Sequence, residues 1–247
     1  MTHVDSEFYS NEAFIAGKSS LKEIEISLLG DIKGLKILHL QCHFGQDSIS
    51  LSRLGAQVTA VDFSPKAIET ANILGQKTGQ NVTFICANVY DLSEILTEQF
   101  DVVFTSYGTI GWLPDLNRWA KIVAHFLKPK GKFVFVEFHP VVWMFDDDFS
   151  KVAYNYFNSG PIFETEVGTY ADKTVDLRSK YVMWKHDFGE VIGNLLAQNL
   201  EMKNFQEYDY SPYNCFSKTI EVGESRFRIE QLNNFIPMVY SLVMVKK

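Results

Sequence analysis

The sequence contains few cysteines, no cluster of basic residues and no long hydrophobic run, and each absence excludes a class of protein. Cys42, Cys86 and Cys215 are the only cysteines among 247 residues, and no two of them form a Cys-x-x-Cys pair. Their odd number and wide spacing argue against a disulfide framework and against a zinc site. We therefore expect three reduced thiols and no bound metal.

Charge and hydropathy exclude two further kinds of partner. The formal net charge is -7 and lysines and arginines form no run, so the chain shows no electrostatic footprint for nucleic acid. No apolar stretch reaches the roughly 20 residues that a membrane span needs. The first residues, MTHVDSEFYS, are polar and acidic rather than basic and then apolar. These features predict no nucleic-acid partner, no membrane contact and a cytoplasmic location. They say nothing of the oligomeric state.

The composition is that of an ordinary globular protein with an excess of aromatic side chains. Hydrophobic residues make up 46% of the chain, charged residues 21% and aromatic residues 14%. An aromatic content this high suggests a lined pocket. An α/β chain of this length commonly forms one unit, so we predict a single domain over residues 1–247.

Short β-rich runs alternate with helical patterns from Leu35 onward, which is typical of βαβ units and a parallel sheet. The predicted strands are residues 35–40, 56–62, 81–86, 100–106 and 132–138, with two more at 201–210 and 237–245. The pattern therefore predicts the α/β class with a doubly wound, mostly parallel sheet.

Three helices between these strands have readable ends. Ser64 and Pro65 begin one that Gly79 ends, and Asp115 begins another before a Lys-Pro-Lys-Gly turn. A third begins at Asp187, where Asp-x-x-Glu resembles a capping box.

Two segments lie outside this alternation. Residues 1–34 read as a helical extension ahead of the core at 35–139, and residues 140–185 form a long aromatic insertion before a C-terminal part at 186–247. Segments of this length in compact domains often act as lids or binding elements. We predict that residues 1–20, with Phe8, Tyr9 and Phe14, cover a cofactor and that residues 140–185 cover the second substrate.

Candidate binding residues follow the strands, because ligands of open parallel sheets bind beyond the carboxyl ends of the strands. Asp62 ends the second strand, where an acid can accept hydrogen bonds from two ribose hydroxyls. An acid there is equally explained by the start of the next helix. The other residues at these ends are Gln41, His43, Gly45, Phe63, Asn88, Val89, Ser106 and Tyr107.

The turn after the first strand is poor in glycine. Residues 37–48 read ILHLQCHFGQDS, with Gly45 as the one glycine. Dinucleotide sites need several glycines because the backbone must approach a pyrophosphate closely. A ligand without phosphate tolerates larger residues if the turn opens slightly.

The order of these segments resembles the class I S-adenosylmethionine-dependent methyltransferases, over the chain from about Leu35 to its end. The first motif departs from the family pattern, since His39 replaces an acid and Gln41 and His43 replace two glycines. The phrases HLQCHFGQDS, GAQVTAVDFS, FTSYGTIGWLPDL and VEFHP are similar to an uncharacterised bacterial subgroup with this variant turn. The resemblance implies a Rossmann-like sheet of seven strands whose last strand is antiparallel.

The resemblance also implies roles for the residues at the strand ends. Gln41 would serve the ammonium of S-adenosylmethionine, and His43 either its carboxylate or only the surface. Phe63 would flank the adenine, although core packing explains it as well. Asn88 and Val89 would meet the edge of the adenine, and Ser106 and Tyr107 would lie near the transferred methyl group.

His139 and His186 are the candidate general bases, because only histidine titrates near neutral pH without perturbation. His139 follows the fifth strand beside the expected pocket, whereas His186 stands at a helix start and could simply cap or pack. We predict Tyr107 and His139 as catalytic residues and Trp112, Trp184 and His186 as acceptor contacts. Further candidates for an aromatic pocket, or for holding a cation by a ring face, are Trp143, Tyr154, Tyr156 and Tyr170.

The predicted function is transfer of a methyl group from S-adenosylmethionine to a small-molecule acceptor. One alternative is a non-catalytic protein that keeps the fold and the ligand, which the missing glycines motivate. A nicotinamide-dependent dehydrogenase is a weaker alternative because Gly-x-Gly-x-x-Gly is absent. Asp146, Asp147 and Asp148 could hold a hard cation, but a solvated acidic loop explains them better.

Overall fold

The structure, a computed structural model, describes residues 11–167 and 178–247. Its α-helices are α1 (Asn11–Ile15), α2 (Glu23–Leu29), α3 (Gln46–Arg53), α4 (Pro65–Thr78), α5 (Leu116–Phe126) and α6 (Phe188–Leu196). Short 3-10 helices are η3 (Val89–Glu94), η4 (Ile110–Trp112) and η5 (Val142–Met144). The strands are β1 (Lys36–Leu40), β2 (Gln57–Asp62), β3 (Val82–Cys86), β4 (Phe100–Ser106), β5 (Leu127–Phe138), β6 (Ile162–Val167), β7 (Arg178–Met183), β8 (Leu200–Tyr208), β9 (Thr219–Gly223), β10 (Arg226–Ile229) and β11 (Val239–Lys246).

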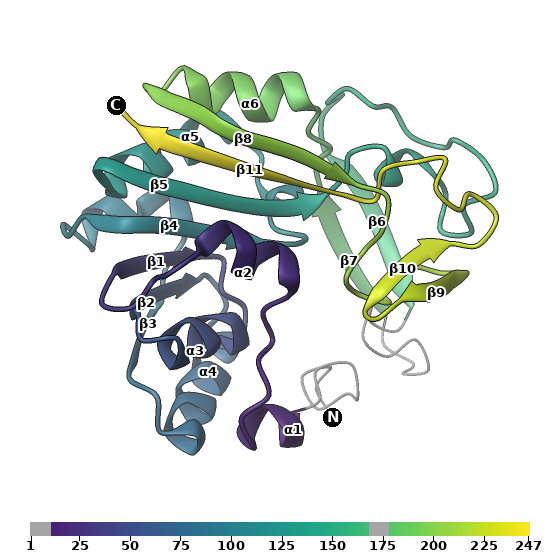
Figure 1. The fold of residues 1–247 in the computed structure, drawn as a ribbon. Helices are drawn as coiled ribbons and strands as arrows, with labels where there is room; N and C mark the ends of the chain where they lie inside the picture. Colours follow the sequence, from purple (N-terminus) through teal and green to yellow (C-terminus); the bar gives the residue numbers. More distant parts are fainter. Residues whose placement is uncertain (1–10, 168–177) are drawn as a thin grey trace.

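The central sheet of the described chain has seven strands in the order β3-β2-β1-β4-β5-β11-β8 (Figure 1). The first five strands in this order run parallel to one another, and β11 lies antiparallel between β5 and β8. This arrangement confirms the predicted Rossmann-like α/β class and the antiparallel last strand. The reversal of strand order at β1 and β4 places a binding crevice beyond their carboxyl ends.

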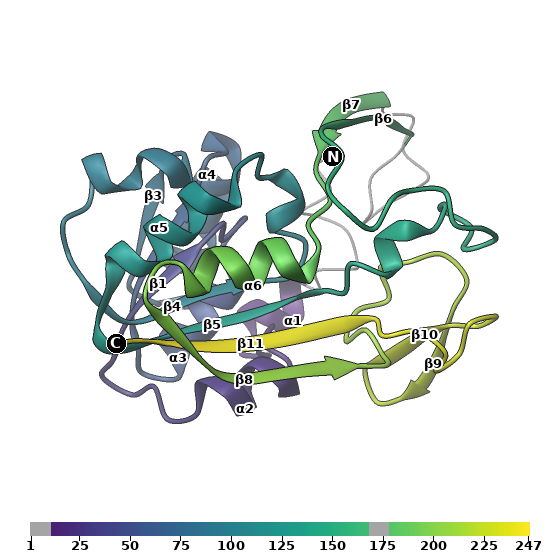
Figure 2. The same cartoon turned by 90° about the horizontal axis from the view of Figure 1, so that it is seen from above.

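Helices cover both faces of the sheet, as a doubly wound fold requires. Figure 2 shows α6 on one side of β5, β11 and β8 and α2 on the other. On the first side, Trp119 of α5 and Val191 and Leu195 of α6 pack on the sheet. On the second side, Leu29 of α2 and Leu51 of α3 belong to a separate apolar cluster. Alternate residues of β1 therefore face different cores.

The predicted helix ends are present at α4, α5 and α6. Ser64 caps α4 by accepting the N–H of Ala67, and Gly79 ends that helix in the left-handed region. Asp115 caps α5 in the same way. At α6 the predicted capping box forms only in half, because Asp187 accepts the N–H of Glu190 while the Glu190 carboxylate turns to other partners.

Three features of the chain differ from the sequence pattern. Strand β5 begins at Leu127 and runs through the predicted Lys-Pro-Lys-Gly turn, where the pairing with β4 shifts register. The insertion contains the hairpin β6–β7, and the segment between β8 and β11 contains the hairpin β9–β10. Both hairpins lie beyond the end of the sheet toward which β4 and β5 run (Figure 1).

The N-terminal extension contains α1 and α2, in agreement with the predicted helices. Phe14 is buried against Phe44, Ile49 and Leu74, which fixes α1 to the side of α3 and α4. Phe8 and Tyr9 of the predicted cofactor cover, and Tyr170 of the aromatic set, lie outside the described residues. The division into a lid, a core and an acceptor insertion stays a prediction.

Candidate active site

The turn after β1 keeps a glycine-like backbone although two of its three special positions carry side chains. Gln41, His43 and Gly45 have φ angles of 56°, 52° and 83°. All three therefore lie in the left-handed region, which costs a residue with a Cβ about 1 kcal/mol or more. Gln41 and His43 stand where the family pattern has glycine, and Gly45 is the glycine that this sequence keeps. The variant motif thus keeps the conformation and accepts strain at Gln41 and His43.

Gln41 is held in place by one end of its amide only. Its Nε2 donates to the carbonyl of Thr109 at 2.8 Å, which ties the β1 turn to the segment after β4. Its Oε1 is buried and accepts no hydrogen bond within the described ranges 11–167 and 178–247. A buried acceptor without a donor is costly, so this oxygen is suited to a donor from a ligand.

Asp62 fills the structural one of the two roles that the sequence left open, and its contact with a ribose stays a prediction. Its Oδ2 accepts the N–H of His43 at 2.9 Å and its Oδ1 accepts the N–H of Ser64 at 2.9 Å, which fixes both the β1 turn and the start of α4. Burial raises the pKa of the carboxyl group, against these hydrogen bonds, which lower it. Each oxygen keeps a second lone pair for a ligand hydroxyl.

The residues predicted around an adenine lie in three different environments. The Phe63 side chain is 73% exposed, so core packing, the alternative explanation, is wrong. Asn88 caps η3, and its side-chain oxygen accepts the N–H of Tyr90 at 3.0 Å. Val89 is buried in the core below, so its backbone alone remains for a ligand. Contacts of these three residues with adenine stay predictions.

His39, which replaces the acid of the family pattern, is part of the core. Its side chain is buried, with Nδ1 2.7 Å from the Ser48 hydroxyl and its ring against Phe104. Burial lowers its pKa to about 4, so the ring is neutral at pH 7. His39 therefore fastens α3 to β1 and brings no charge to the site.

Glu137, which was not among the predicted site residues, positions the turn after β4. Its buried carboxylate at the end of β5 accepts the N–H groups of Gly108, Thr109 and Ile110, as well as the Thr109 hydroxyl. Burial raises its pKa, and these hydrogen bonds oppose that shift. The sequence signal for this role was an acidic residue, Glu137, within the mostly apolar strand KFVFVEF. Because Thr109 also holds Gln41, Glu137 indirectly supports the first turn.

A polar cluster lies where β4 ends, and it joins Ser106 and Tyr107 to two acids that the sequence analysis did not select. The Tyr107 hydroxyl donates to Glu25 Oε2 at 2.9 Å, and the Ser106 hydroxyl donates to Asp47 Oδ2 at 3.1 Å. Glu25 is fully buried, and burial together with the charge of Asp47 raises its pKa to about 7. We define Glu25, Asp47, Ser106 and Tyr107 as the β4-end cluster.

The prediction of His139 as a general base disagrees with its contacts. The buried ring accepts the N–H of Val141 at Nδ1 over 3.1 Å, so Nε2 carries the proton, 2.8 Å from Glu207. Both nitrogens are thus engaged by protein atoms, and neither remains to take a proton from an acceptor. His139 instead fixes the chain as it leaves β5.

Substitution of His139 by glutamine should therefore lower the free energy of unfolding by about 1 to 3 kcal/mol, the cost of leaving buried partners unpaired. Thermal and denaturant unfolding of the variant would measure this loss. The exposed His125→Gln is a matched control and should change stability little. Unaltered stability of His139→Gln combined with lost turnover would restore the catalytic role.

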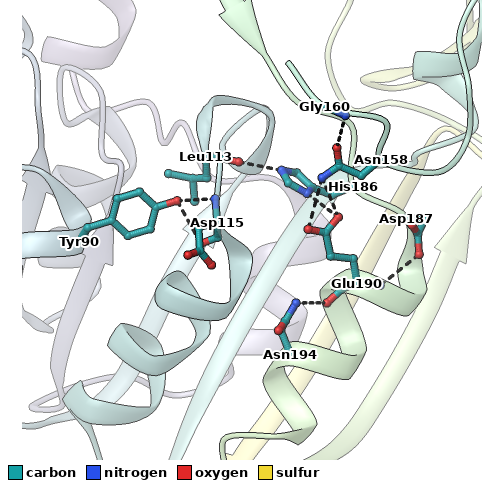
Figure 3. A network of polar contacts seen from close by, with 9 residues as sticks. All are labelled: Tyr90, Leu113, Asp115, Asn158, Gly160, His186, Asp187, Glu190 and Asn194. Atoms are coloured by element: carbon teal, nitrogen blue, oxygen red, sulfur yellow. Dashed lines mark hydrogen bonds and ion pairs between the residues drawn. The ribbon is translucent and has the colours of Figure 1, made fainter. Parts of the chain in front are cut away.

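Of the residues predicted to contact the acceptor, Trp112 lies at the surface and His186 is bonded to protein atoms, while the contact of the Trp184 side chain stays a prediction. Trp112 is half exposed and packs its ring against Tyr181, 5.7 Å between centroids. The Trp184 N–H donates to the carbonyl of Gly111 at 2.8 Å. His186 is buried, its Nε2 donates to the carbonyl of Leu113 at 2.9 Å, and its Nδ1 lies 2.8 Å from Glu190 (Figure 3). A direct role of His186 as a base is therefore wrong for this conformation.

Two further expectations concern metals and membranes. Asp146 accepts the N–H and hydroxyl of Ser150 and the N–H of Lys151, which makes it a loop-capping residue. Within residues 11–167 and 178–247, no group of three or more His, Cys, Asp or Glu side chains is arranged to hold a metal ion. In the same residues, every helix is too short or too polar to cross a membrane.

Comparison with known proteins identifies the class of domain. Residues 37–131 match the family model described as a methyltransferase domain. The crystal structure of an S-adenosylmethionine dependent methyltransferase from Mesorhizobium loti superposes with a TM-score of 0.62 at 19% identity, covering 94% of this chain and 100% of the other. The strand order and the superposition show a Rossmann-like fold, and residues 37–131 are similar to a methyltransferase domain.

Relatives by sequence share only part of the chain. Ubiquinone biosynthesis O-methyltransferase of Xanthomonas oryzae pv. oryzae is 35% identical over 102 residues, which are 41% of this chain and 42% of that protein. The uncharacterized methyltransferase YbaJ of Bacillus subtilis is 28% identical over 131 residues, 53% of this chain and 51% of that protein. The chain thus spans about half or less of the length of these curated relatives.

Proposed function

We propose that this protein transfers the methyl group of S-adenosylmethionine to a small-molecule acceptor. The observation that carries the proposal is the buried, unpartnered Oε1 of Gln41 at the end of β1. It lies in the region similar to a methyltransferase domain, beside the crevice that the strand order creates. A nicotinamide dinucleotide suits this turn less well, because Gln41 and His43 carry side chains where a pyrophosphate needs close approach.

The residues at the strand ends fit S-adenosylmethionine. Gln41 Oε1 offers an acceptor for its ammonium, Asp62 offers a lone pair on each oxygen for ribose hydroxyls, and Phe63 offers an exposed ring to adenine. When bound, the cofactor supplies a methyl group already activated by a sulfonium. The protein then has mainly to position the acceptor and exclude water.

In this proposal the β4-end cluster orients the acceptor. The Tyr107 hydroxyl keeps Glu25 as its acceptor partner, and its own lone pairs remain for a donor of the substrate. Glu25, with a pKa raised to about 7 by burial, can accept a proton passed through Tyr107 when the acceptor must lose one. We therefore keep Tyr107 as a proposed catalytic residue and no longer propose His139 as one.

A non-catalytic S-adenosylmethionine-binding protein is the second candidate. The observation that favours it is the full engagement of both His139 and His186 by protein atoms. Methyl transfer to any member of a panel of small phenols, amines and carboxylates would decide for the enzyme. We also propose a cytoplasmic location, because no disulfide joins the three cysteines, all of which the structure describes.

Calorimetry with S-adenosylmethionine, its demethylated product and NAD tests the proposal directly. We expect micromolar binding of the first two and none of NAD. Heat of binding for NAD alone would reverse the assignment. The oligomeric state can be measured on the same sample. The proposed function does not depend on its value.

Asp62→Ala should weaken S-adenosylmethionine binding by about 1.5 to 3 kcal/mol, the range for hydrogen bonds to a charged group. Calorimetry measures the affinity for S-adenosylmethionine. Thermal unfolding measures the stability that the variant loses with the His43 and Ser64 hydrogen bonds. Glu69→Ala, on the exposed side of α4, removes the same charge and serves as the control. Unchanged affinity in a folded Asp62→Ala protein would leave the carboxylate a purely structural role.

A further inference from the structure

The insertion contains a cavity of about 150 Å³ that is separate from the β1 turn. Tyr154, Asn155, Phe157, Ser159 and Lys185 contribute to its lining. The lining therefore combines aromatic rings, polar side chains and the ammonium group of Lys185. Small-molecule sites commonly have this composition, with apolar walls and a few polar groups that fix the orientation of the ligand.

Lys185 is the charged group of the cavity, and its ammonium has no acid directly bonded to it in the described residues. Only 9% of the residue is exposed. Its Nζ lies over the ring of Tyr154, 3.7 Å from the centroid. The nearby Glu164 instead accepts the Tyr154 hydroxyl at 2.6 Å. Tyr154 was predicted either to line an aromatic pocket or to hold a cation by its ring face, and that face is occupied by a cation of the protein itself.

Burial lowers the pKa of Lys185 to about 8, and the charge of Glu164 opposes that shift. The ammonium therefore stays mostly protonated at pH 7. A buried charge that lacks a hydrogen-bonded counter-ion destabilises a folded protein, and a bound anion would relieve that cost. Two other polar side chains, Asn155 and Ser159, lie together at 3.4 Å in the same lining.

Hydrogen bonds join the chain around Lys185 to the segment after β4. Lys185 stands between Trp184 and His186, which bind the carbonyls of Gly111 and Leu113. That segment follows β4 and includes Thr109, whose carbonyl holds Gln41. The chain neighbours of Lys185 are therefore bonded to the segment after β4 that also holds Gln41.

The wall of the cavity is fixed to α6 as well. Asn158 donates to Glu190 Oε2 at 3.2 Å and accepts the N–H of Gly160 at 3.0 Å (Figure 3). Glu190 in turn lies 2.8 Å from His186, next to Lys185 in the chain. The cavity therefore has a preformed polar frame, which reduces the entropy lost on binding.

We propose that this cavity binds a carboxylate group of the methyl acceptor, with Lys185 as its counter-ion and the Tyr154 and Phe157 rings beside its apolar part. The inference rests on the proposed function, because it identifies the cavity as the acceptor site. Binding supplies the negative charge that Lys185 lacks, so the ammonium forms a charge-assisted hydrogen bond. The acceptor class is accordingly a small carboxylic acid with an aromatic or apolar body.

The test uses the full chain saturated with S-adenosylmethionine and a panel of benzoate, phenylacetate, cinnamate and hexanoate, each paired with its primary amide. Calorimetry and ligand-observed NMR should find at least one acid that binds about ten-fold or more tightly than its amide, a difference of about 1.4 kcal/mol. Lys185→Met should abolish this preference and Lys185→Arg should keep part of it. Lys180→Met, an exposed lysine of β7, should leave it unchanged. Inorganic phosphate, added as a competitor, shows whether any anion suffices.

A second measurement does not depend on the choice of acid. If Lys185 serves a ligand, Lys185→Met should unfold at the same or a higher temperature than the parent protein, because an uncompensated buried charge is removed. A clear fall in melting temperature, or equal binding of every acid and its amide, overturns the proposal. If the carboxylate proposal fails while the parent protein still binds S-adenosylmethionine, the proposed function stands. If the parent protein does not bind S-adenosylmethionine, the proposed function itself is contradicted.

Discussion

Replacement of Gly45 by alanine should lower the free energy of unfolding by about 2 to 4 kcal/mol, through overpacking and backbone strain together. A Cβ at this position would lie 2.6 Å from Phe84 Cε1 and 3.1 Å from Ala71 Cβ. Its φ of 83° is also unfavourable for any residue with a side chain. Gly45 therefore allows α3 to begin directly against β3 and α4, whatever its contact with the cofactor.

Denaturant unfolding of Gly45→Ala beside Gly79→Ala separates the two causes. Gly79 has a φ of 65°, and its missing Cβ would meet no atom of the described residues within 4 Å. Its substitution should cost about 1 kcal/mol, the strain alone. Phe84→Leu in the Gly45→Ala background should recover part of the difference. Equal losses for the two alanine variants would show that Phe84 yields and that close packing is not what requires the glycine.

The central strands β4 and β5 were predictable because they are largely buried on both faces and read as mostly apolar runs. The predicted ranges 100–106 and 132–138 both lie within these strands. The strand at 237–245 was predicted from its own pattern, and only the antiparallel direction of β11 came from the family resemblance. Helix ends were predictable where one local contact defines them, as at Ser64 and Asp115.

The hairpins β6–β7 and β9–β10 were not predicted, because their strands do not carry a buried apolar run. In β9, four of the five residues are exposed. The capping box at α6 failed for a different reason. Glu190 has a distant partner in Asn158, 32 positions away, that no local pattern reveals. Tertiary contacts thus override the local signal at the segments around the candidate site.

For the site itself, the sequence predicted where residues lie along the strands but not what they contact. His139 does follow β5, yet Glu207 from a strand far along the chain takes its Nε2. Glu25 stands in the helix sequence EIEISLL, where an acid normally faces solvent. Only the packing of α2 on the sheet buries it beside Tyr107. The contacts of His139 therefore argue against the general base predicted there, and the acids of the β4-end cluster were overlooked.

Glu25 should make the stability of the free protein depend on pH between about 4.5 and 7. Its pKa is raised from 4.5 to about 7 when the chain folds, chiefly by burial and then by the charge of Asp47. In this range the folded state holds a proton that the unfolded state has released, so stability falls as pH rises. The loss is absent below pH 4.5 and complete above pH 7, at about 3 kcal/mol.

Glu25→Gln removes this titration and keeps an acceptor oxygen for the N–H of Lys22. Relative to the variant, the parent protein should lose about 3 kcal/mol of unfolding free energy between pH 4.5 and 7.5, because only the parent must bury a charge at the higher pH. Denaturant unfolding of both proteins across this range gives the difference directly. Glu23→Gln, an exposed acid on the same helix, is the control and should give a nearly flat difference. A flat difference for Glu25→Gln as well would mean that water or a cation reaches the carboxylate, and the proton-accepting role proposed for Glu25 through Tyr107 would then lose its physical basis.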